Sequence, residues 1–322
     1  MPDIITMGEL LIDFIPYEKD CKLKDVDKFS KAAGGAPANV AAALGRIGCS
    51  TGFIGMIGKD SFGDFLLDTM AEQGVNIQQI IRTDEAMTTL AFVSLQADGE
   101  RDFAFYRKPG ADMLLKQDEI DLDYLKSADI FHFGTISLTD EPVRSTTKFL
   151  VQKAKENGSL ITFDPNIRIA LWDHELDKLK QEYLKVLPDV DLLKLNIEEL
   201  RKLHPDQTSK LDDQINLENL KAVAKSIFAQ GPKYIVITDG SNGSYFISEN
   251  HAFHAKTEKI KALDTTGAGD AFMAGILSKL IAKDNLEDLN WESALKRANK
   301  FGAITCSRYG AIPALPDKDD LD

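Results

Sequence analysis

Short runs of apolar residues recur along this chain, and stretches with helical spacing separate them. Leu160–Phe163, 192–195 and Tyr234–Thr238 are almost uninterrupted apolar runs of the length of a strand. Such runs are typical of strands buried on both faces, as in a parallel sheet. Between them, 197–203 and 217–230 have the spacing of amphipathic helices.

The same alternation extends over the rest of the chain. Further strands are expected at 4–15, where Gly8 and Glu9 interrupt the pattern, and at 51–57, 130–136 and 244–247. Further helices are expected at 38–47, 62–73, 143–156, 271–282 and 292–305. Because strands that alternate with helices form a parallel sheet covered on both faces, we predict an α/β fold. Its form is a three-layer α/β/α sandwich around a mostly parallel sheet.

One segment breaks the alternation. The runs TLAFVSLQ and RDFAFYR flank the residues ADGE, and Asp98-Gly99 is a strong hairpin signal. We therefore expect a small β-sheet beside the main one, built from about residues 11–33 and 88–110, within a single domain over 1–322. The polar segment 206–214 is expected to be a surface loop.

Composition excludes several classes of protein. The net charge of −13 argues against non-specific nucleic-acid binding, which needs basic side chains to replace counterions. The three cysteines, Cys21, Cys49 and Cys306, have no metal-ligand spacing and are typical of a reduced, cytoplasmic protein. His251 and His254 are close but lack supporting ligands. The N-terminus does not resemble a signal peptide, and no run approaches the roughly 18 apolar residues of a membrane span.

The stretch GAGDAFMAG carries the clearest sign of chemistry. The chain has neither GxxxxGK[ST] nor a GxGxxG after the first strand, so a phosphate site must be built in another way. Gly267 and Gly269 allow backbone N–H groups to converge at a helix start, which would form an anion hole. Asp270 would then take a proton from an attacking hydroxyl. The alternative is an ordinary turn with Asp270 as a helix cap.

Two other motifs follow buried strands. The turn TDGSNG, 238–243, offers a hydroxyl and glycine N–H groups to phosphates at the end of a strand, although it also fits a simple hairpin. Asn196 and Glu199 are three residues apart, so both lie on one face of a helix's first turn, where they would hold a hydrated Mg²⁺. A surface helix start explains this pair equally well.

Four motifs together resemble one family. DTTGAGDAF and GGAPANVAAALGRIG, 34–48, are similar to the two signatures of the ribokinase-like (pfkB) carbohydrate kinases. The NxxE pair and the TDGSNG turn occur in that family's order, so the resemblance covers nearly the whole chain. FAFYRKPGADMLL, 103–115, and FDPNIRIALW, 163–172, resemble segments of fructokinases. GGAPAN, where ribokinase has GGKGAN, sets the chain apart from ribokinase itself.

The resemblance implies roles on the sugar side of a kinase site. Asp270 would be the catalytic base, and Gly267, Ala268 and Gly269 would supply the anion hole. The implied sugar-binding residues are Asp13, Gly34, Gly35, Asn39, Phe103, Tyr106 and Arg168. From the residues alone, a buried unpaired Asp13 would be costly, which favours a functional role over an exposed strand face. Arg168 at the surface, and Phe103 and Tyr106 as hairpin packing, remain alternatives.

The resemblance also implies a nucleotide side and metal ions. The implied ATP-binding residues are Asn196, Thr238, Gly240, Ser241, Gly243, Gly269 and Asn299. Glu199 would act on Mg²⁺ through water. Activation by K⁺ is common in the family, and the matching positions are Asp264, Thr266, Thr305, Arg308 and Gly310. The last K⁺ ligand of the family often carries a hydroxyl, whereas this chain has Ala314 there.

The expected activity is therefore that of an ATP-dependent sugar kinase, with D-fructose as substrate and fructose 6-phosphate as product. Kinases of aminoimidazole riboside or 2-keto-3-deoxygluconate are the alternatives among enzymes, because the former share much of the Tyr106 and Arg168 pattern. A non-catalytic sugar or nucleotide sensor and a dinucleotide-dependent oxidoreductase are alternatives from other classes. The small β-sheet is expected to close as a lid and to pair in a homodimer.

Overall fold

The computed structural model describes the chain except residues 19–21, 96–100, 209–210, 212–214, 282–285 and 322. The side chains of 94–95, 101–103, 288 and 321 also lie outside the description. None of the described helices is long and apolar enough to cross a membrane.

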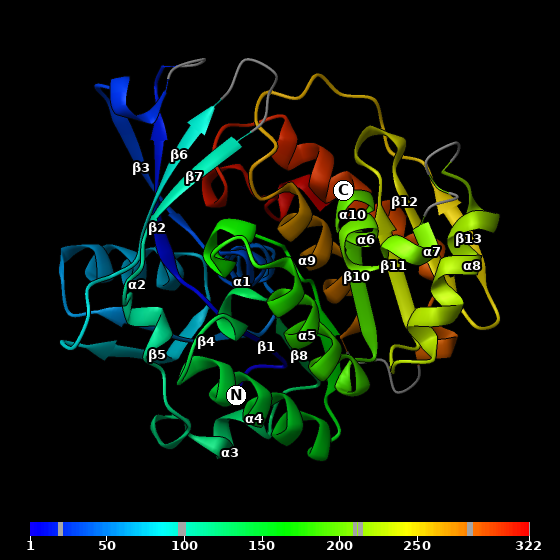
Figure 1. Ribbon diagram of the computed structural model, residues 1–322, viewed down its shortest axis with the longest axis horizontal. Helices are drawn as coiled ribbons and strands as arrows, with labels where there is room; N and C mark the ends of the chain where they lie inside the picture. The colour runs from blue at the N-terminus through cyan, green and yellow to red at the C-terminus, as the bar shows by residue number, and fades with distance from the viewer. Residues whose placement is uncertain (19–21, 96–100, 209–210, 212–214, 282–285, 322) are drawn as a thin grey trace.

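A nine-stranded sheet runs through the middle of the molecule (Figure 1). Its strands, in spatial order, are β13 (Ala252–Ala255), β12 (Ser244–Ser248), β11 (Tyr234–Thr238), β10 (Leu192–Asn196), β9 (Leu160–Phe163), β8 (Ile130–Phe133), β1 (Ile4–Met7), β4 (Thr51–Gly58) and β5 (Asn76–Thr83). The strands from β11 to β5 pair in parallel, whereas β12 and β13 pair antiparallel. The mostly parallel sheet expected from the apolar runs is thus confirmed.

Helices cover both faces of this sheet, because neighbouring strand residues point to opposite sides. Leu193 and Ile235 join one apolar core, whereas Leu192 and Val236 join the other. The first core is closed by α4 (Val143–Glu156), α5 (Leu176–Val186), α6 (Ile197–Leu203) and α8 (Leu217–Phe228). The second is closed by α1 (Ala36–Arg46), α2 (Ser61–Glu72), α9 (Ala268–Leu280) and α10 (Trp291–Cys306). Two short helices, α3 (Leu122–Leu125) and α7 (Pro205–Thr208), complete the set of α-helices among the described residues, and several 3-10 turns lie between the elements.

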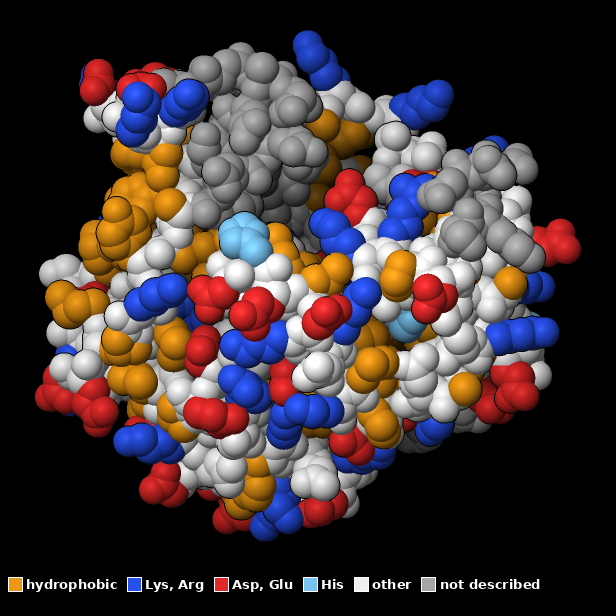
Figure 2. All heavy atoms as spheres, in the orientation of Figure 1, with side chains coloured by type: hydrophobic (Ala, Val, Ile, Leu, Met, Phe, Trp, Pro, Cys, Tyr) orange, Lys and Arg blue, Asp and Glu red, His pale blue; other side chains and the backbone are white. Residues whose placement is uncertain are grey.

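A second sheet of four strands stands beside the first, in the order β3 (Phe29–Gly34), β2 (Leu11–Pro16), β6 (Leu90–Leu95) and β7 (Arg101–Tyr106). The antiparallel pairing of β6 with β7 confirms the hairpin, although Asp98-Gly99 itself lies outside the described residues. Aromatic side chains cover the outer face of this sheet, where Phe14 stacks on Phe92 with ring centroids 4.8 Å apart. Figure 2 shows the hydrophobic surface over β2, β3 and α2, at the upper left.

Three sequence expectations about strands and loops were wrong in detail. Residues 4–15 form two strands in different sheets, because the chain leaves the main sheet at Glu9, whose Oε1 accepts from the N–H of Ala36 at the start of α1 (2.7 Å). The strand expected at 130–136 ends at Phe133. The polar segment 206–214 is partly helical, and Leu211 within it is buried.

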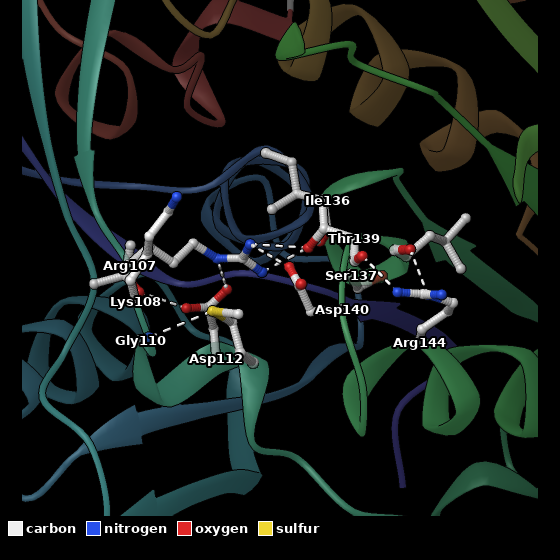
Figure 3. Close-up of polar contacts among 12 residues, drawn as sticks. Arg107, Lys108, Gly110, Asp112, Ile136, Ser137, Thr139, Asp140 and Arg144 are labelled. Carbon is white, nitrogen blue, oxygen red and sulfur yellow. Dashed lines mark hydrogen bonds and ion pairs between the residues drawn. The ribbon is translucent and has the colours of Figure 1, made fainter. Parts of the chain in front are cut away.

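A buried polar network joins the small sheet to the body of the molecule (Figure 3). Arg107 follows β7 directly, and its Nε donates to Oδ2 of Asp112 at 2.7 Å. Its other nitrogens donate to Oγ1 of Thr139 at 2.9 Å and to the carbonyl of Ile136 at 3.2 Å, both in the segment after β8. The side chains of Arg107 and Asp112 are 3% and 2% exposed. This network therefore fixes the end of the hairpin to the main sheet.

Candidate active site

A cavity of about 310 Å³ lies where the small sheet meets the carboxyl ends of β9 and β10 and the start of α9. The open edge at the carboxyl ends of parallel strands is where α/β proteins bind ligands. The residues proposed from sequence that line it are Asp13, Gly35, Asn39, Arg168, Asn196, Glu199, Thr266, Gly267, Gly269 and Asp270. Segments far apart in the sequence therefore converge on one site.

The start of α9 supplies the anion-binding part of this site. Gly267 is the residue before the first helical turn and has φ 75°, in the left-handed region that glycine adopts without strain. The helix begins at Ala268, three residues earlier than the sequence pattern indicates, so its first N–H groups stand beside the cavity. The N–H of Ala268 donates to the carbonyl of Thr265 at 3.3 Å. The helix start adds partial positive charge at this point.

Asp270 lies in the first turn of α9, and its side chain is buried. Its two oxygens accept hydrogen bonds from different side chains. Nδ2 of Asn39 donates to Oδ2 at 2.8 Å, and Nδ2 of Asn166 donates to Oδ1 at 3.0 Å. Burial raises the pKa of Asp270 from 3.8 to about 6, while the bond from Asn39 lowers it. The carboxylate is thus ionised at neutral pH and more basic than an ordinary aspartate.

A buried ion pair lies next to this acid. Nζ of Lys194, on β10, donates to Oδ2 of Asp164 at 2.5 Å, and both side chains are 5% exposed. Burial opposes the charge of Lys194, but Asp164 and Glu199 together raise its pKa above the ordinary value. Sequence reasoning assigned no role to Asp164, Asn166 or Lys194, although all three line the cavity. The signal for Lys194 was a charge inside the apolar run LLKL, because a buried charge requires a partner.

Asn196 and Glu199 form a reciprocal cap at the start of α6. Oδ1 of Asn196 accepts from the N–H of Glu199 at 2.8 Å, and Oε2 of Glu199 accepts from the N–H of Asn196 at 3.0 Å. Oε1 of Glu199 accepts from the N–H of Ile167 at 2.8 Å. Burial, and then the charge of Asp164, raise the pKa of Glu199. The pair therefore caps a helix start that lines the cavity, and Glu199 is buried there, whereas the alternative expected a helix start at the surface.

The residues expected on the sugar side are only partly brought together. Asp13 lies against Gly34, where an added Cβ would come within 2.1 Å of Oδ2 of Asp13, so only glycine allows this approach. Tyr106 is 68% exposed and packs edge to face on Phe92 at the outer face of the small sheet, away from the cavity. Phe105, its neighbour on β7, points into the cavity instead. The side chain of Phe103 lies outside the described residues.

The residues expected on the nucleotide side are divided: Asn196 and Gly269 line the cavity described above, whereas Ser241 and Asn299 line two adjoining hollows. Ser241 lines a cavity of about 660 Å³, together with Lys256 and Thr257. Asn299 lines a second one, which shares Lys256 and Thr257 with the first. Nδ2 of Asn299 donates to the carbonyl of Ala255 at 3.0 Å. Thr238 is the last residue of β11, and Gly240 and Gly243 belong to the turn between β11 and β12, beside Ser241.

Asp264 organises part of the proposed K⁺ region. Its Oδ1 accepts from the N–H and the hydroxyl of Thr266 at 2.9 and 2.6 Å, and its Oδ2 accepts from the N–H of Gly310 at 3.0 Å. The Arg308 guanidinium pairs with Asp320 at 2.9 Å, and the hydroxyl of Thr305 donates to the carbonyl of Phe301 at 3.0 Å. Within the described part of the chain, no three His, Cys, Asp or Glu side chains form a metal site.

Comparison with known proteins identifies the family. The pfkB family carbohydrate kinase pattern matches residues 1–318. A probable chloroplastic fructokinase-6 of Arabidopsis thaliana is 40% identical over 320 residues, which are 99% of this chain and 81% of that relative.

Solved structures agree with this. The crystal structure of a fructokinase from Xylella fastidiosa with bound ATP has a TM-score of 0.85 and 32% identity, covering 99% of this chain and 97% of that one. The aminoimidazole riboside kinase of Salmonella enterica has a TM-score of 0.82 and 25% identity, with the same two coverages. The chain therefore belongs to the pfkB family of carbohydrate kinases, and it is a phosphotransferase that acts on a sugar hydroxyl.

Proposed function

We propose that this enzyme is a fructokinase, which transfers the γ-phosphoryl group of Mg·ATP to the primary hydroxyl of D-fructose and forms fructose 6-phosphate. One observation carries the proposal. The buried carboxylate of Asp270 lies in the same cavity as the glycines at the start of α9, so a base and an anion-binding helix start face one space. The names of the relatives, among them the fructokinase crystallised with ATP, support the choice of sugar and donor.

The proposed mechanism moves one proton and one phosphoryl group. The sugar hydroxyl oxygen forms a bond to the γ-phosphorus while the bond from that phosphorus to the ADP oxygen breaks. Asp270 accepts the hydroxyl proton, which its pKa of about 6 favours at neutral pH. The N–H groups of Gly267 and Gly269, which line the cavity, stabilise the negative charge on the phosphoryl oxygens in transit, whereas that of Ala268 already donates to Thr265.

Sugar recognition is assigned to polar groups around the cavity. Asp13, Asn39 and Arg168 would bond the sugar hydroxyls, and Gly34 and Gly35 would let the backbone approach the ring. Oδ1 of Asn39 is buried and accepts no hydrogen bond from the described residues, so it suits a sugar hydroxyl. Phe105 lines the cavity, whereas Tyr106, which was expected to contact the sugar, does not.

Two metal ions belong to the proposal. Mg²⁺ neutralises phosphate charge when bound, and Glu199 would hold it through water, because both carboxylate oxygens already accept backbone N–H groups. K⁺ would lie beside the anion hole on backbone carbonyls near Asp264, Thr266 and Gly310, which one carboxylate already draws together. Ala314 supplies no hydroxyl to that site.

The small sheet is proposed to close as a lid over the sugar, excluding water that would otherwise hydrolyse ATP. Its aromatic outer face is proposed to pair in a homodimer. The members of that face are Phe14, Phe29, Phe92 and Tyr106, which pack on one another, and Phe62 of α2, which packs on Phe14.

The three cysteines suit a reducing compartment, which we propose is the cytoplasm.

A kinetic screen tests the substrate. D-Fructose, aminoimidazole riboside and 2-keto-3-deoxygluconate are each supplied with Mg·ATP, with and without K⁺, and ADP release is measured. We expect the highest kcat/KM with fructose and a higher turnover when K⁺ is present. Of the three substrates, only fructose is expected to raise the melting temperature. A preference for the riboside would instead favour an aminoimidazole riboside kinase, the activity of the similar Salmonella enterica protein. No sugar-dependent ADP release with any of the three would contradict the proposal and favour a sensor.

A further inference from the structure

Asn166 holds one of the two carboxylate oxygens of Asp270, as Asn39 holds the other. Asn39 comes from α1, and Asn166 comes from the segment that follows β9, 104 residues before Asp270 in the chain. Each oxygen therefore has its own amide donor, and the two donors together fix the rotation of the carboxylate. This arrangement is typical of a group whose orientation matters.

The backbone that carries Asn166 is itself held on both sides. Asn166 has φ 43°, in the left-handed region that asparagine adopts more readily than most other residues. Before it, the carbonyl of Pro165 accepts from the N–H and the hydroxyl of Thr135, at 3.2 and 2.6 Å. After it, the N–H of Ile167 donates to Glu199 at 2.8 Å. The amide is therefore presented to Asp270 from a rigid support.

The charges around Asp270 come from several elements. Burial raises its pKa most, and Asp164 raises it further, whereas the bond from Asn39 and the charges of Lys194 and Arg168 lower it. Glu9, Asp13, Glu198 and Glu199 are the other acids that line the cavity, and Lys202 is its other cation. An amide that donates to Oδ1 favours the ionised form, as the Asn39 amide does at Oδ2. The Asn166 amide therefore stabilises the ionised form of Asp270, which burial disfavours.

We propose that Asn166 is a positioning residue for Asp270, and that its amide keeps the carboxylate oriented and ionised for the proton transfer. The inference rests on the proposed function, in which Asp270 is the base. It differs from the role proposed for Asn39, whose carbonyl oxygen is left for the sugar.

Two variants of Asn166 test this. Asn166→Gly removes the amide and tolerates the left-handed backbone. Asn166→Asp keeps the size of the side chain but sets an acid against Asp270 in place of a donor. For each variant, kcat and KM for D-fructose are measured at saturating Mg·ATP from pH 5 to pH 9. We expect the acid limb of kcat to move to higher pH, by about one unit in Asn166→Gly and by more in Asn166→Asp.

An unchanged midpoint in Asn166→Asp, or an effect confined to KM for fructose, would overturn the proposal. Thr135→Val is the matched control, because it removes a hydroxyl bond to Pro165 in the same segment without touching Asp270. Its acid midpoint is expected to move much less than that of Asn166→Gly, because the N–H of Thr135 still donates to the carbonyl of Pro165 and the Asn166 amide is kept, and a shift as large as that of Asn166→Gly would also overturn the proposal. Asp270→Asn is measured in parallel. Near-normal turnover in Asp270→Asn would contradict the proposed function itself. If Asp270→Asn is inactive but the acid midpoints of kcat in the two Asn166 variants equal that of the wild type, only this inference is contradicted.

Discussion

At the scale of the residue, the site is governed by acids that the fold removes from water. Glu9 is 2% exposed at the joint between the two sheets. Burial raises its pKa from 4.5 to about 7, although the N–H of Ala36 lowers it. Such a raised pKa means that ionised Glu9 destabilises the folded chain. The protein tolerates this acid because its Oε1 caps the start of α1.

Glu9→Gln is expected to make the protein less sensitive to alkaline pH. The contribution of Glu9 to stability is full below its unfolded pKa of 4.5 and is lost as pH rises through about 7. Glutamine keeps an oxygen that accepts from the N–H of Ala36, and it cannot ionise. The free energy of unfolding of the variant should therefore exceed that of the wild type by up to about 3 kcal/mol at pH 8.5. Urea unfolding at pH 5 and pH 8.5 measures this. An equal difference between the two proteins at both pH values would show that Glu9 does not titrate as described.

At the scale of the element, the hairpin β6–β7 depends on the network that follows it. Arg107 and Asp112 are both buried, and each satisfies the other's charge. A buried pair contributes little net stability, but removal of one partner leaves an uncompensated charge. The geometry of the small sheet over the cavity is therefore sensitive to either residue.

Arg107→Met is expected to lower the free energy of unfolding by about 3 to 5 kcal/mol, because Asp112 would keep its charge without a partner. The double variant Arg107→Met/Asp112→Leu should recover part of the loss. Lys108→Met is the matched control, since Lys108 is 86% exposed in its pair with Asp173, and a change below about 0.5 kcal/mol is expected. Urea unfolding of the three variants checks this. If Arg107→Met were as stable as Lys108→Met, Arg107 would not fix the hairpin to the main sheet.

Elements with strong patterns could be predicted from the sequence, and elements that depend on their neighbours could not. The buried parallel strands were predicted because both of their faces are apolar. β5 was missed because it is an edge strand in which only Ile80 and Thr83 are buried. α5 was missed although Leu179, Tyr183 and Val186 have helical spacing, so its periodicity would have identified it.

The same distinction holds for the site. Asp270 and the glycines before it form a local motif, which sequence reasoning can read. Asn166 contacts Asp270 only because β9 and α9 meet in space, and no spacing in the sequence indicates that contact. Tyr106 and Phe105 are neighbours on a strand, so a shift of one residue exchanges the cavity for the outer face.

At the scale of the whole molecule, the aromatic outer face of the small sheet is the surface through which we propose that two copies of the chain pair. Tyr106 is 68% exposed at its edge, and Phe92 packs under it. Exposed apolar patches on a β-sheet mark interaction sites. The proposed homodimer would bury this face and bring two small sheets together.

Tyr106→Glu is therefore expected to convert a dimer into a monomer without unfolding it, because the side chain is exposed and its charge would be buried only in the dimer. Light scattering coupled to size exclusion, at micromolar protein, measures the mass. Tyr309→Glu is the control, since Tyr309 is 63% exposed and is not among the aromatic residues of that face. Equal masses for the wild type and Tyr106→Glu would contradict pairing through this face.

The role of Asp270 is tested most directly by fructose-dependent ADP release from the wild type and from Asp270→Asn. The amide keeps the size of the side chain but accepts no proton, so kcat should fall by about 100-fold or more while KM for both substrates changes only a few-fold. The melting temperatures of the two proteins, measured together, show whether the variant is folded. Wild-type turnover that depends on fructose and is lost in folded Asp270→Asn is the predicted result, and near-normal turnover in Asp270→Asn would contradict it.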